Sequence, residues 1–337
     1  MNIRQIGAEA QEQVVKEMSE KGKLTPMSWS EEAVIKEMIV TDDGSREFIE
    51  KVTYDAYTGR ENVPLLYKDI YSTQTDGNFP KTFTVKEFGP VQTVFLQKME
   101  GGEVKFGALG SGPEKTVSFE TWAAGIEYDE DIVEWNQTWR VSDIGVSFGE
   151  SYNKLLNHLH LSPIISGTYV TTGGGLSAQK AKQEATTNAA AQLIAYDTSI
   201  AKTLTNALQV LPRGTIVLHN SFDAFALQNA IASDMLPDLS AGPVKRSLAN
   251  ANFIAYDGTT VEVGGKTYTY DGVAQGFVYL LVPKVNFKEY IKHYLRVDSD
   301  DGDLSRLVLA QVVGRARRAQ LAGLSGAFGA IKVDIAS

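Results

Sequence analysis

The stretch from residue 91 to residue 128 constrains the fold most strongly, because its apolar and polar residues roughly alternate between glycine-rich breaks. It reads VQTVFLQKMEGGEVKFGALGSGPEKTVSFETWAAGIEY, with breaks at residues 101–102 and 110–113. Alternation of this kind predicts β-strands that bury one face. A hairpin alone is marginally stable at best in water. Its large aromatic side chains therefore need a surface to pack against: Phe95, Phe106, Phe119 and Trp122.

The composition narrows the class of protein. The chain has 337 residues, enough for two or three units with their own cores, and its apolar share of 43% and charged share of 22% are typical of globular proteins. Its net charge of −9 argues against a protein that wraps nucleic acid with a basic surface, although a small basic patch remains compatible. The chain contains no cysteine and 4 histidines, which excludes disulfides, thiolate zinc sites and cysteine nucleophiles.

No segment suggests a membrane or a secreted protein. The N-terminal residues MNIRQIGAEAQEQVVKEMSEKGK lack the apolar core of a signal peptide. The longest apolar run, FVYLLVP at 277–283, is too short to span a bilayer. We therefore expect a soluble product, made in the cytosol of the cell that expresses it, with no membrane partner.

The first half of the chain contains one clear long helix. Residues 1–28 are polar and read as an arm that lies on another surface, a short helix follows, and residues 41–90 read as irregular, with prolines as breakers. The segment DEDIVEWNQTWRVSDIGVSFGESYNKLLNHLHL then has an apolar stripe at three-and-four spacing and is expected to end at Ser162-Pro163.

The second half alternates expected helices and strands, so the predicted fold class is α+β. A second helix is expected over about 178–210, followed by a buried strand in GTIVLHN. The segment SFDAFALQNAIASDM predicts a helix with Ser221 as its N-cap. The segment TTVEVGGKTYTYDG predicts a hairpin that turns at Gly264-Gly265. Two further strands are expected in FVYLLVP and DLSRLVLAQVVGRARRAQL.

Two loops contain part of a known ligand-binding motif but lack residues that the motif requires. A phosphate-binding loop ending in GGKT needs a glycine five positions before Gly265, where Thr260 stands, and its flanks read as strands. The segment VDSDDGD at 297–303 lacks the glycine and glutamate of a calcium-binding EF-hand. We therefore interpret this segment as an acidic turn before the last strand. Weak cation binding between subunits remains an alternative.

The histidines do not indicate catalysis either. His158 and His160 are two apart, so on a helix they point to different faces, and we expect both to be surface histidines. His219, Ser221 and Asp223 contain the residue types of a catalytic triad, but three residues within five positions seldom converge. We therefore expect no catalytic residue, no cofactor and no metal.

One dense basic cluster stands out in the last expected strand. Arg315, Arg317 and Arg318 alternate there with apolar neighbours. Three interpretations remain open for them: simple surface solvation, contact with phosphate on an inner face, or salt bridges to an acidic neighbour.

The order of these parts resembles the Hong Kong 97 fold of tailed-bacteriophage major capsid proteins. The segment YDEDIVEWNQTWRVSDIGVSFGESYNKLLNHL looks like the acidic lead-in and spine helix of that family. The segment YLRVDSDDGDLSRLVLAQVVGRARRAQLAGLSGAFGAIKVDI is similar to its closing segment. The resemblance rests on the order and lengths of elements, because the family has no invariant short motif. It implies an N-terminal arm at 1–60, an extended loop and flanks at 61–128, a peripheral-domain spine helix at 129–165, an axial domain at 166–285, and a return strand with the C-terminus at 286–337.

The resemblance also implies a function. It implies a structural, non-enzymatic protein whose hexamers and pentamers form an icosahedral shell around double-stranded DNA, held without sequence specificity. The shell would be assembled in the host cytoplasm and become part of the virion, with scaffolding, portal or decoration proteins as further partners. In the family the extended loop lies across a neighbouring subunit, which makes the aromatic residues and the arginine cluster candidate inter-subunit contacts. The simpler interpretation is that the aromatic residues pack within one chain.

Further alternatives remain. Lys98, Lys105 and Lys115 lie in the expected loop, where some family members form an isopeptide cross-link, but the sequence identifies no acceptor or glutamate for one. An encapsulin-type nanocompartment would share the fold and enclose a cargo enzyme. A cytosolic α+β enzyme with an unrecognised site, or another phage structural protein such as a tail or connector component, is the remaining interpretation.

Overall fold

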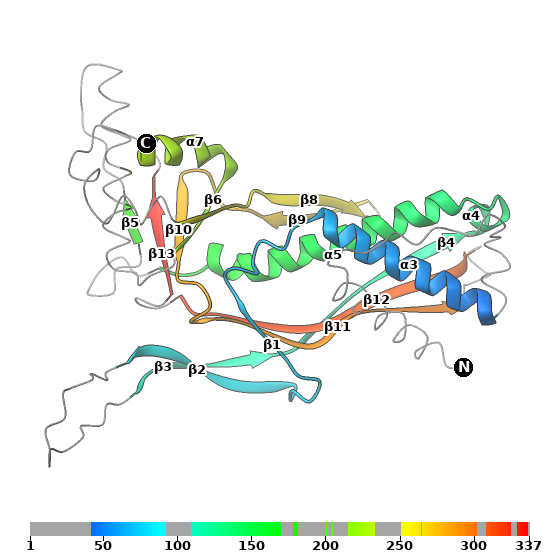
Figure 1. Cartoon of the computed structure of the whole chain (residues 1–337), viewed down its shortest axis with the longest axis horizontal. Helices are drawn as coiled ribbons and strands as arrows, with labels where there is room; N and C mark the ends of the chain where they lie inside the picture. The colour runs from blue at the N-terminus through cyan, green and yellow to red at the C-terminus, as the bar shows by residue number, and fades with distance from the viewer. Residues whose placement is uncertain are drawn as a thin grey trace, which may run out of the picture.

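The structure is a computed structural model. It describes residues 42–91, 109–169, 178–180, 200, 204, 215–232, 251–263, 265–301, 308–324 and 329–335. Figure 1 shows an elongated molecule in which one long helix runs along a twisted sheet, with a smaller sheet at one end and a hairpin that projects from the body. The predicted α+β class is confirmed.

The long helix is α5 (Thr138–Ile165), and its apolar stripe faces inward as the spacing predicts. Phe148, Tyr152 and Leu156 are among its buried residues, and they belong to the largest hydrophobic core. The helix continues through Pro163 to Ile165, so the expected end at Ser162-Pro163 was too early. A five-residue helix, α4 (Glu130–Glu134), precedes it.

A second long helix, α3 (Asp42–Asn62), packs directly on α5. A Cβ atom added at Gly59 would lie 1.9 Å from the carbonyl oxygen of Val146, and one added at Gly149 would lie 1.8 Å from that of Ala56. The two backbones therefore touch, which only glycine allows. The prediction that residues 41–90 are irregular was wrong for this segment. Threonine, tyrosine and aspartate have modest helix propensity, and packing against α5 overrides it.

A four-stranded sheet supports α5, in the order β1-β11-β12-β4. The pairs β11–β12 and β12–β4 are antiparallel, whereas β1 runs parallel to β11. The arginine-rich strand is confirmed as β12, but its long partner β11 was not predicted. The strands are β1 (Ser72–Thr75), β4 (Glu120–Asp129), β11 (Phe287–Asp301) and β12 (Val308–Ala322).

The two faces of this sheet differ because side chains alternate along each strand. On β12 the residues facing α5 are buried, and a Cβ atom added at Gly314 would lie 2.2 Å from the Phe148 ring. The alternate residues of β12 are exposed on the other side: Val313, Arg315 and Arg317. The helix thus covers one face. On the other face Phe79, Phe83 and Phe119 pack over Ala319 and Leu321, and the described residues leave the part around Arg315 and Arg317 open.

The smaller sheet has five strands in the order β5-β13-β10-β6-β7 and its own apolar core. The predicted strands in GTIVLHN and FVYLLVP are confirmed as β6 and β10. Strand β5 occupies the start of the segment expected to be a helix over 178–210. Within the rest of that segment the structure describes Ile200 and Leu204, which are helical and fully buried in this core. The strands are β5 (Ala178–Lys180), β6 (Ile216–His219), β7 (Asn252–Ala255), β10 (Phe277–Leu281) and β13 (Ala330–Asp334).

Two local elements lie between these strands. The predicted hairpin is confirmed as β8 (Gly258–Val263) and β9 (Lys266–Asp271), with Gly265 at a φ of 72° in its turn. The predicted helix is present as a short 3-10 turn, η1 (Ser221–Asp223), followed by α7 (Ala224–Ala232). Its cap differs from the prediction. The Asn220 side chain accepts a hydrogen bond from the backbone N–H of Phe222, whereas Ser221 donates its hydroxyl to Asp257.

The projecting hairpin consists of β2 (Thr82–Val91) and β3 (Leu109–Ser118). The prediction of strands in this region is confirmed, but β2 begins earlier than expected. Strand β3 also runs through residues 110–113, where a break was expected. The expected turn at 101–102 lies outside the described residues. The five domain ranges remain predictions, and α3 crosses the first boundary at residue 60.

Candidate assembly surfaces

The hairpin β2–β3 is the element that most clearly extends from the body (Figure 1). Its two strands pair with each other from Thr82 and Ser118 to Val91 and Leu109, and with no other described strand. A two-stranded ribbon of this kind buries little apolar area by itself. The described part of the molecule therefore holds the base of the hairpin, whereas the strands beyond the base form no sheet with another described element.

An aromatic cluster anchors the base of the hairpin to the four-stranded sheet. The rings of Phe79 and Phe83 stack with 5.6 Å between centroids, and the Phe83 ring meets the Tyr290 ring edge-on at 4.9 Å. Phe119 joins them with a centroid 5.5 Å from that of Phe79, and only 9% of it is exposed. This corrects the expectation for Phe119, because it already packs within its own chain and offers little surface to a neighbour.

The other predicted aromatic contacts have different positions. Phe95 and Phe106 lie outside the described residues. Trp122 is half-buried on the face of the sheet that carries α5, since it pairs with Ala316 on that side of β12. Trp122 therefore belongs to a site different from that of Phe119, although only two residues separate them in the sequence.

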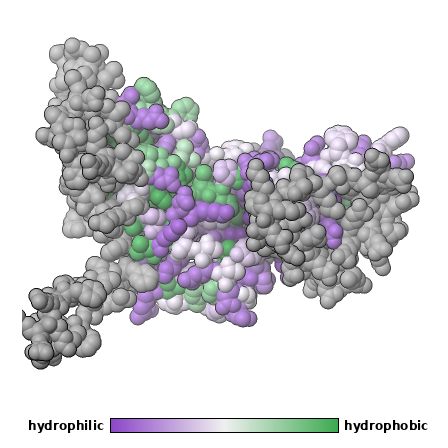
Figure 2. Space-filling view, viewed as in Figure 1, coloured by the Kyte–Doolittle hydropathy of each residue, from purple (hydrophilic) through white to green (hydrophobic). Residues whose placement is uncertain are grey.

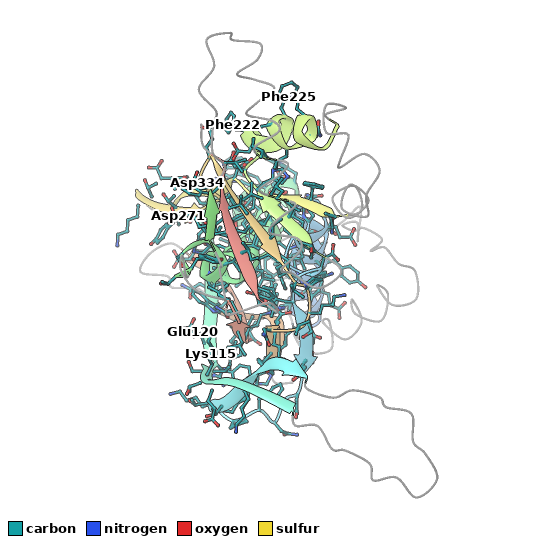
Figure 3. The ribbon with its side chains drawn as sticks, turned by 90° about the vertical axis from the view of Figure 1, so that its left-hand side faces the viewer. Lys115, Glu120, Phe222, Phe225, Asp271 and Asp334 are labelled. Atoms are coloured by element: carbon teal, nitrogen blue, oxygen red, sulfur yellow. The ribbon has the colours of Figure 1, made fainter. Side chains whose placement is uncertain are left out.

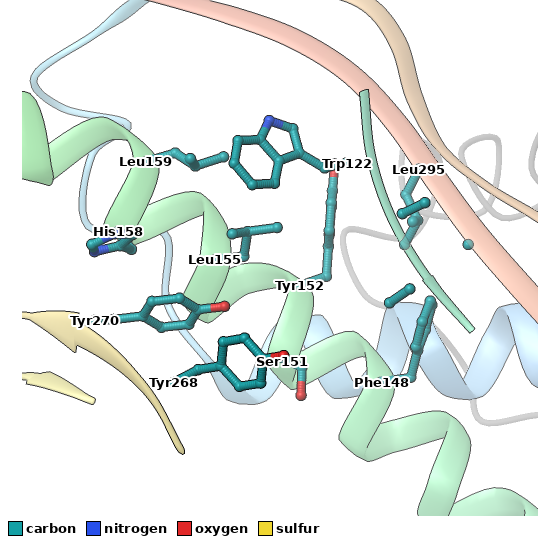
Figure 4. Close-up of a pocket in the computed structure, with 13 residues that line it drawn as sticks. Trp122, Phe148, Ser151, Tyr152, Leu155, His158, Leu159, Tyr268, Tyr270 and Leu295 are labelled. Carbon is teal, nitrogen blue, oxygen red and sulfur yellow. The ribbon is translucent and has the colours of Figure 1, made fainter. Parts of the chain in front are cut away.

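Trp122 lines an apolar pocket of about 420 Å³ between α5, the sheet and the β8–β9 hairpin. In Figure 4, Tyr268 and Tyr270 of β9 face α5 across this pocket. The ring of His158 stacks on that of Tyr270 with centroids 4.7 Å apart, and burial lowers the pKa of His158. The remaining lining residues are Ala123, Ala124, Phe148, Ser151, Tyr152, Leu155, Leu159, Leu295 and Gly314.

The predicted arginine cluster divides between the two faces of the sheet. Arg315 and Arg317 lie on the open face, where Arg315 pairs with Asp298 at 2.5 Å and the Arg317 Nε atom donates to the Thr121 hydroxyl at 2.9 Å. The prediction that Asp298 lies in an acidic turn was wrong, because it is part of strand β11.

Strand β11 adds basic residues to this open face that were not predicted from the sequence. His293 pairs in register with Arg317, and Arg296 pairs with Arg315. Burial, and then the charges of Arg296 and Arg317, lower the pKa of His293, so the positive charge of this face comes from its lysine and arginines. This grouping is visible only through the register of two consecutive antiparallel strands, whose bulges shift the pairing. The basic face is defined as Lys292, His293, Arg296, Arg315 and Arg317.

Arg318 lies on the opposite face and is buried beneath α5. Its Nη1 atom is 2.5 Å from Glu289 Oε1, and its Nε atom donates to the Tyr152 hydroxyl at 3.1 Å. Tyr67 donates to the same Glu289 oxygen at 3.2 Å. This corrects the expectation that Arg318 is a candidate inter-subunit contact, because only 4% of it is exposed and its guanidinium group is engaged by Glu289 and Tyr152 beneath α5.

His160 completes this buried network. Its Nε2 atom lies 3.2 Å from Glu289 Oε1, and its ring stacks on Tyr67 with centroids 3.7 Å apart. Only 1% of His160 is exposed, so the expectation of a surface histidine was wrong. Burial alone would raise the pKa of Glu289, but the neighbouring His160 and Arg318 and a hydrogen bond from Thr73 lower it to about 2.

The structure also exposes aromatic residues at two ends of the molecule, and the sequence had not indicated them as surface residues. Trp135 is 72% exposed and Trp139 is 65% exposed near the start of α5, and Phe222 and Phe225 are 78% and 73% exposed beside α7. Figure 3 shows Phe222 and Phe225 at the end opposite Lys115. In Figure 2, hydrophobic residues gather over the α7 end of the visible face. Their sequence signal was weak, because single aromatic residues at helix starts do not show which side faces solvent.

The rejected catalytic triad does not form in the structure. His219 Nδ1 lies 2.7 Å from the Asn220 carbonyl oxygen, Ser221 contacts Asp257, and Asp223 accepts a hydrogen bond from the backbone N–H of Gly276. Within the described residues, no three histidine or carboxylate side chains gather closely enough to hold a metal ion.

None of the described helices combines the length and the apolar character needed to cross a membrane.

Comparison with known proteins gives matches among solved structures alone. No protein-family model matches the chain, and no curated protein matches it in sequence. A structure described as the capsid of cyanophage P-SCSP1u is 13% identical, with 81% of this chain and 88% of that chain covered and a TM-score of 0.49. A structure of the mature capsid of bacteriophage PhiM1 is 12% identical, with coverage of 80% and 86% and a TM-score of 0.47. A virus-like particle from Pyrococcus furiosus is 12% identical, with coverage of 85% and 98% and a TM-score of 0.48.

Proposed function

We propose that this chain is a major capsid protein that self-assembles into an icosahedral shell around double-stranded DNA. The observation that carries the proposal is the projecting hairpin β2–β3. Among described strands its two strands pair only with each other, yet an aromatic cluster holds its base firmly on the body. A ribbon that is anchored at one end and unsupported along its length is suited to reach a second subunit.

The order of elements supports the same proposal. The chain runs from α3 through the hairpin to the long helix α5, then through the five-stranded sheet, and returns as the long strands β11 and β12. This is the order expected from the resemblance to the Hong Kong 97 fold. The C-terminal strand β13 completes the five-stranded sheet, so the two sheets are joined by more than one crossing of the chain.

A structural role also fits the partners of the titratable groups. His160 and Arg318 both contact the buried Glu289 carboxylate beneath α5, at the junction of helix and sheet. A buried network of this kind stabilises the body, and its charged groups are directed at one another rather than at solvent. We therefore infer a structural protein rather than an enzyme.

The finer parts of the proposal follow from assembly into a shell. Hexamers and pentamers of the chain would form the shell in the host cytoplasm and enclose DNA without sequence specificity. The particle would become the virion, with scaffolding, portal or decoration proteins as further partners. The net charge of −9 is compatible with this role, because packaged DNA brings its own counterions.

Electron microscopy of the purified chain, expressed alone or with its neighbouring genes, tests the proposal. We expect closed particles tens of nanometres across that protect double-stranded DNA from nuclease. A particle that encloses a protein cargo instead of DNA would indicate an encapsulin-type compartment. A monomer or dimer that binds a small molecule, with no particles under any condition, would contradict both interpretations.

The substitution Phe106→Asp sharpens this test. Phe106 lies in the segment that connects β2 and β3, and we expect the change to prevent assembly while the monomer remains folded. Circular dichroism and thermal unfolding of the monomer provide the control. An equal loss of monomer stability would show that Phe106 belongs to an ordinary intramolecular core.

A further inference from the structure

We propose that the basic face binds an acidic tip on a second copy of this chain. The acidic tip is defined as Asp129, Asp131, Glu134, Trp135 and Trp139, at the junction of β4, α4 and α5. The inference rests on the proposed assembly of the chain and names two of the surfaces that meet.

The basic face has more positive charge than the described residues of its own chain neutralise. Among those residues, Asp298 is the carboxylate that forms an ion pair there; it pairs with Arg315 and leaves 44% of that arginine side chain exposed. Within the described residues neither Arg296 nor Arg317 forms an ion pair. These groups lie on the side of the sheet that α5 does not cover, so their guanidinium groups are available to another molecule.

The acidic tip has the opposite character. Asp129, Asp131 and Glu134 are all exposed, and none of them pairs with a cation in the part of the chain that the structure describes. Trp135 and Trp139 are 72% and 65% exposed beside them. Exposed tryptophans next to charged groups are typical anchors of protein interfaces.

The two surfaces are chemically complementary. Arginine guanidinium groups bind carboxylates through paired, charge-assisted hydrogen bonds. They also lie favourably over tryptophan rings, the best aromatic partners for a cation. A basic face with arginines therefore matches both components of the tip, the carboxylates and the indoles.

The two surfaces cannot meet within one chain. Tyr128, the residue before the tip, pairs with Ala310, whereas Arg315 and Arg317 lie five and seven residues further along β12. At about 3.3 Å per residue this is a separation of roughly 16–23 Å along a hydrogen-bonded strand. The contact is therefore between copies. Because the two surfaces differ, it is a head-to-tail contact, which can close into a ring.

Double-stranded DNA is the competing occupant, because arginines also bind phosphates. The second copy is favoured because Asp298 lies within the basic face and because the chain as a whole has a net charge of −9. The exposed tryptophans of the tip also require a protein surface, and DNA on the basic face would leave them uncovered.

Charge reversal on each surface, followed by reversal on both, tests the inference in the full-length chain. The face variant combines Arg296→Glu with Arg317→Glu and preserves the Arg315–Asp298 pair. The tip variant combines Asp131→Arg with Glu134→Arg. We expect each to weaken self-association at least about tenfold in sedimentation velocity and to reduce the particle yield, because like charges then oppose each other across the contact. The four substitutions together should restore both readouts.

A matched control combines Lys68→Glu with Lys266→Glu, two exposed lysines outside both surfaces, and should associate like the parent chain. Circular dichroism checks that every variant is folded. The inference is overturned if the parent chain assembles and the face and tip variants assemble equally well, or if the four substitutions together fail to restore association. It is also overturned if the face variant assembles normally but no longer binds a double-stranded DNA probe. A parent chain that never associates would instead contradict the proposed function itself.

Discussion

The two faces of the four-stranded sheet use the same residue type for opposite purposes. Arg318 is 4% exposed and is enclosed beneath α5 with Glu289, whereas its neighbour Arg317 is exposed on the open side. The difference arises because successive side chains on a strand point to opposite faces. A single arginine-rich run thus supplies both an internal ion pair that stabilises the body and an external surface that is available to other molecules.

The largest expected effect is on the covered face. Arg318→Ala would leave the Glu289 carboxylate buried without its cation, which typically costs about 3–5 kcal/mol of unfolding free energy. The matched change Arg317→Ala on the open face should alter it by less than about 0.5 kcal/mol. Urea unfolding of both variants measures the contrast. Equal losses would show that the two faces do not differ in this way.

The acid sensitivity of the body should come from the same buried pair. The pKa of Glu289 is lowered from an ordinary value of 4.5 to about 2 in the folded chain. Because the folded state binds the proton more weakly than the unfolded state, this stabilisation is complete above pH 4.5. It is lost as the pH falls toward 2 and amounts to about 3 kcal/mol.

Thermal unfolding between pH 5 and pH 2 measures this effect. The variant Glu289→Gln should have a lower stability than the parent chain at pH 5 and a flatter dependence on pH. A variant with the parent's full pH dependence would assign the acid sensitivity to other groups.

Packing gives the next contrast. Gly314→Val on the covered face would drive a side chain into the Phe148 ring, which lies 2.2 Å from the position of an added Cβ atom. We expect a loss of about 1–3 kcal/mol, the usual range for overpacking a core. Gly125→Ala on the open face is the control, because its added Cβ atom would have no atom closer than 3.8 Å. Denaturant midpoints compare the two, and a tolerated Gly314→Val would mean that α5 can move away from the sheet.

The smallest expected effect is at the surface pair. Asp298→Asn removes the ion pair with Arg315, and exposed pairs contribute about 0–1 kcal/mol. Stability should therefore change little, while self-association should become stronger at low salt because the basic face gains net charge. A strong loss of stability would contradict the description of this face as solvent-exposed.

Much of the architecture was predictable because its elements have clear periodicity. The apolar stripe of α5 and the short apolar run of β10 identify a helix and a strand from local residues alone. Helix α3 was missed because it is specified by contacts with α5, where Gly59 and Gly149 let two backbones touch. No local pattern indicates that a glycine faces another helix.

The candidate surfaces were harder to predict than the fold. The sequence identified Arg315, Arg317 and Arg318 as a group, but only strand register shows that they face opposite ways. Strand register also places His293 and Arg296 beside two of them. Whether a charged side chain lies inside or outside depends on its tertiary partners, such as the Glu289 carboxylate, and a linear sequence does not contain these pairings.

The alternation along β12 also restricts how this segment can change in evolution. Deleting one residue near its centre would turn every following side chain to the opposite side, burying Arg317 without an acid and moving Arg318 away from Glu289. Deleting two adjacent residues would preserve the sidedness and shift only the pairing. We therefore expect insertions or deletions of an even number of residues in this strand to be tolerated, and those of an odd number to be selected against.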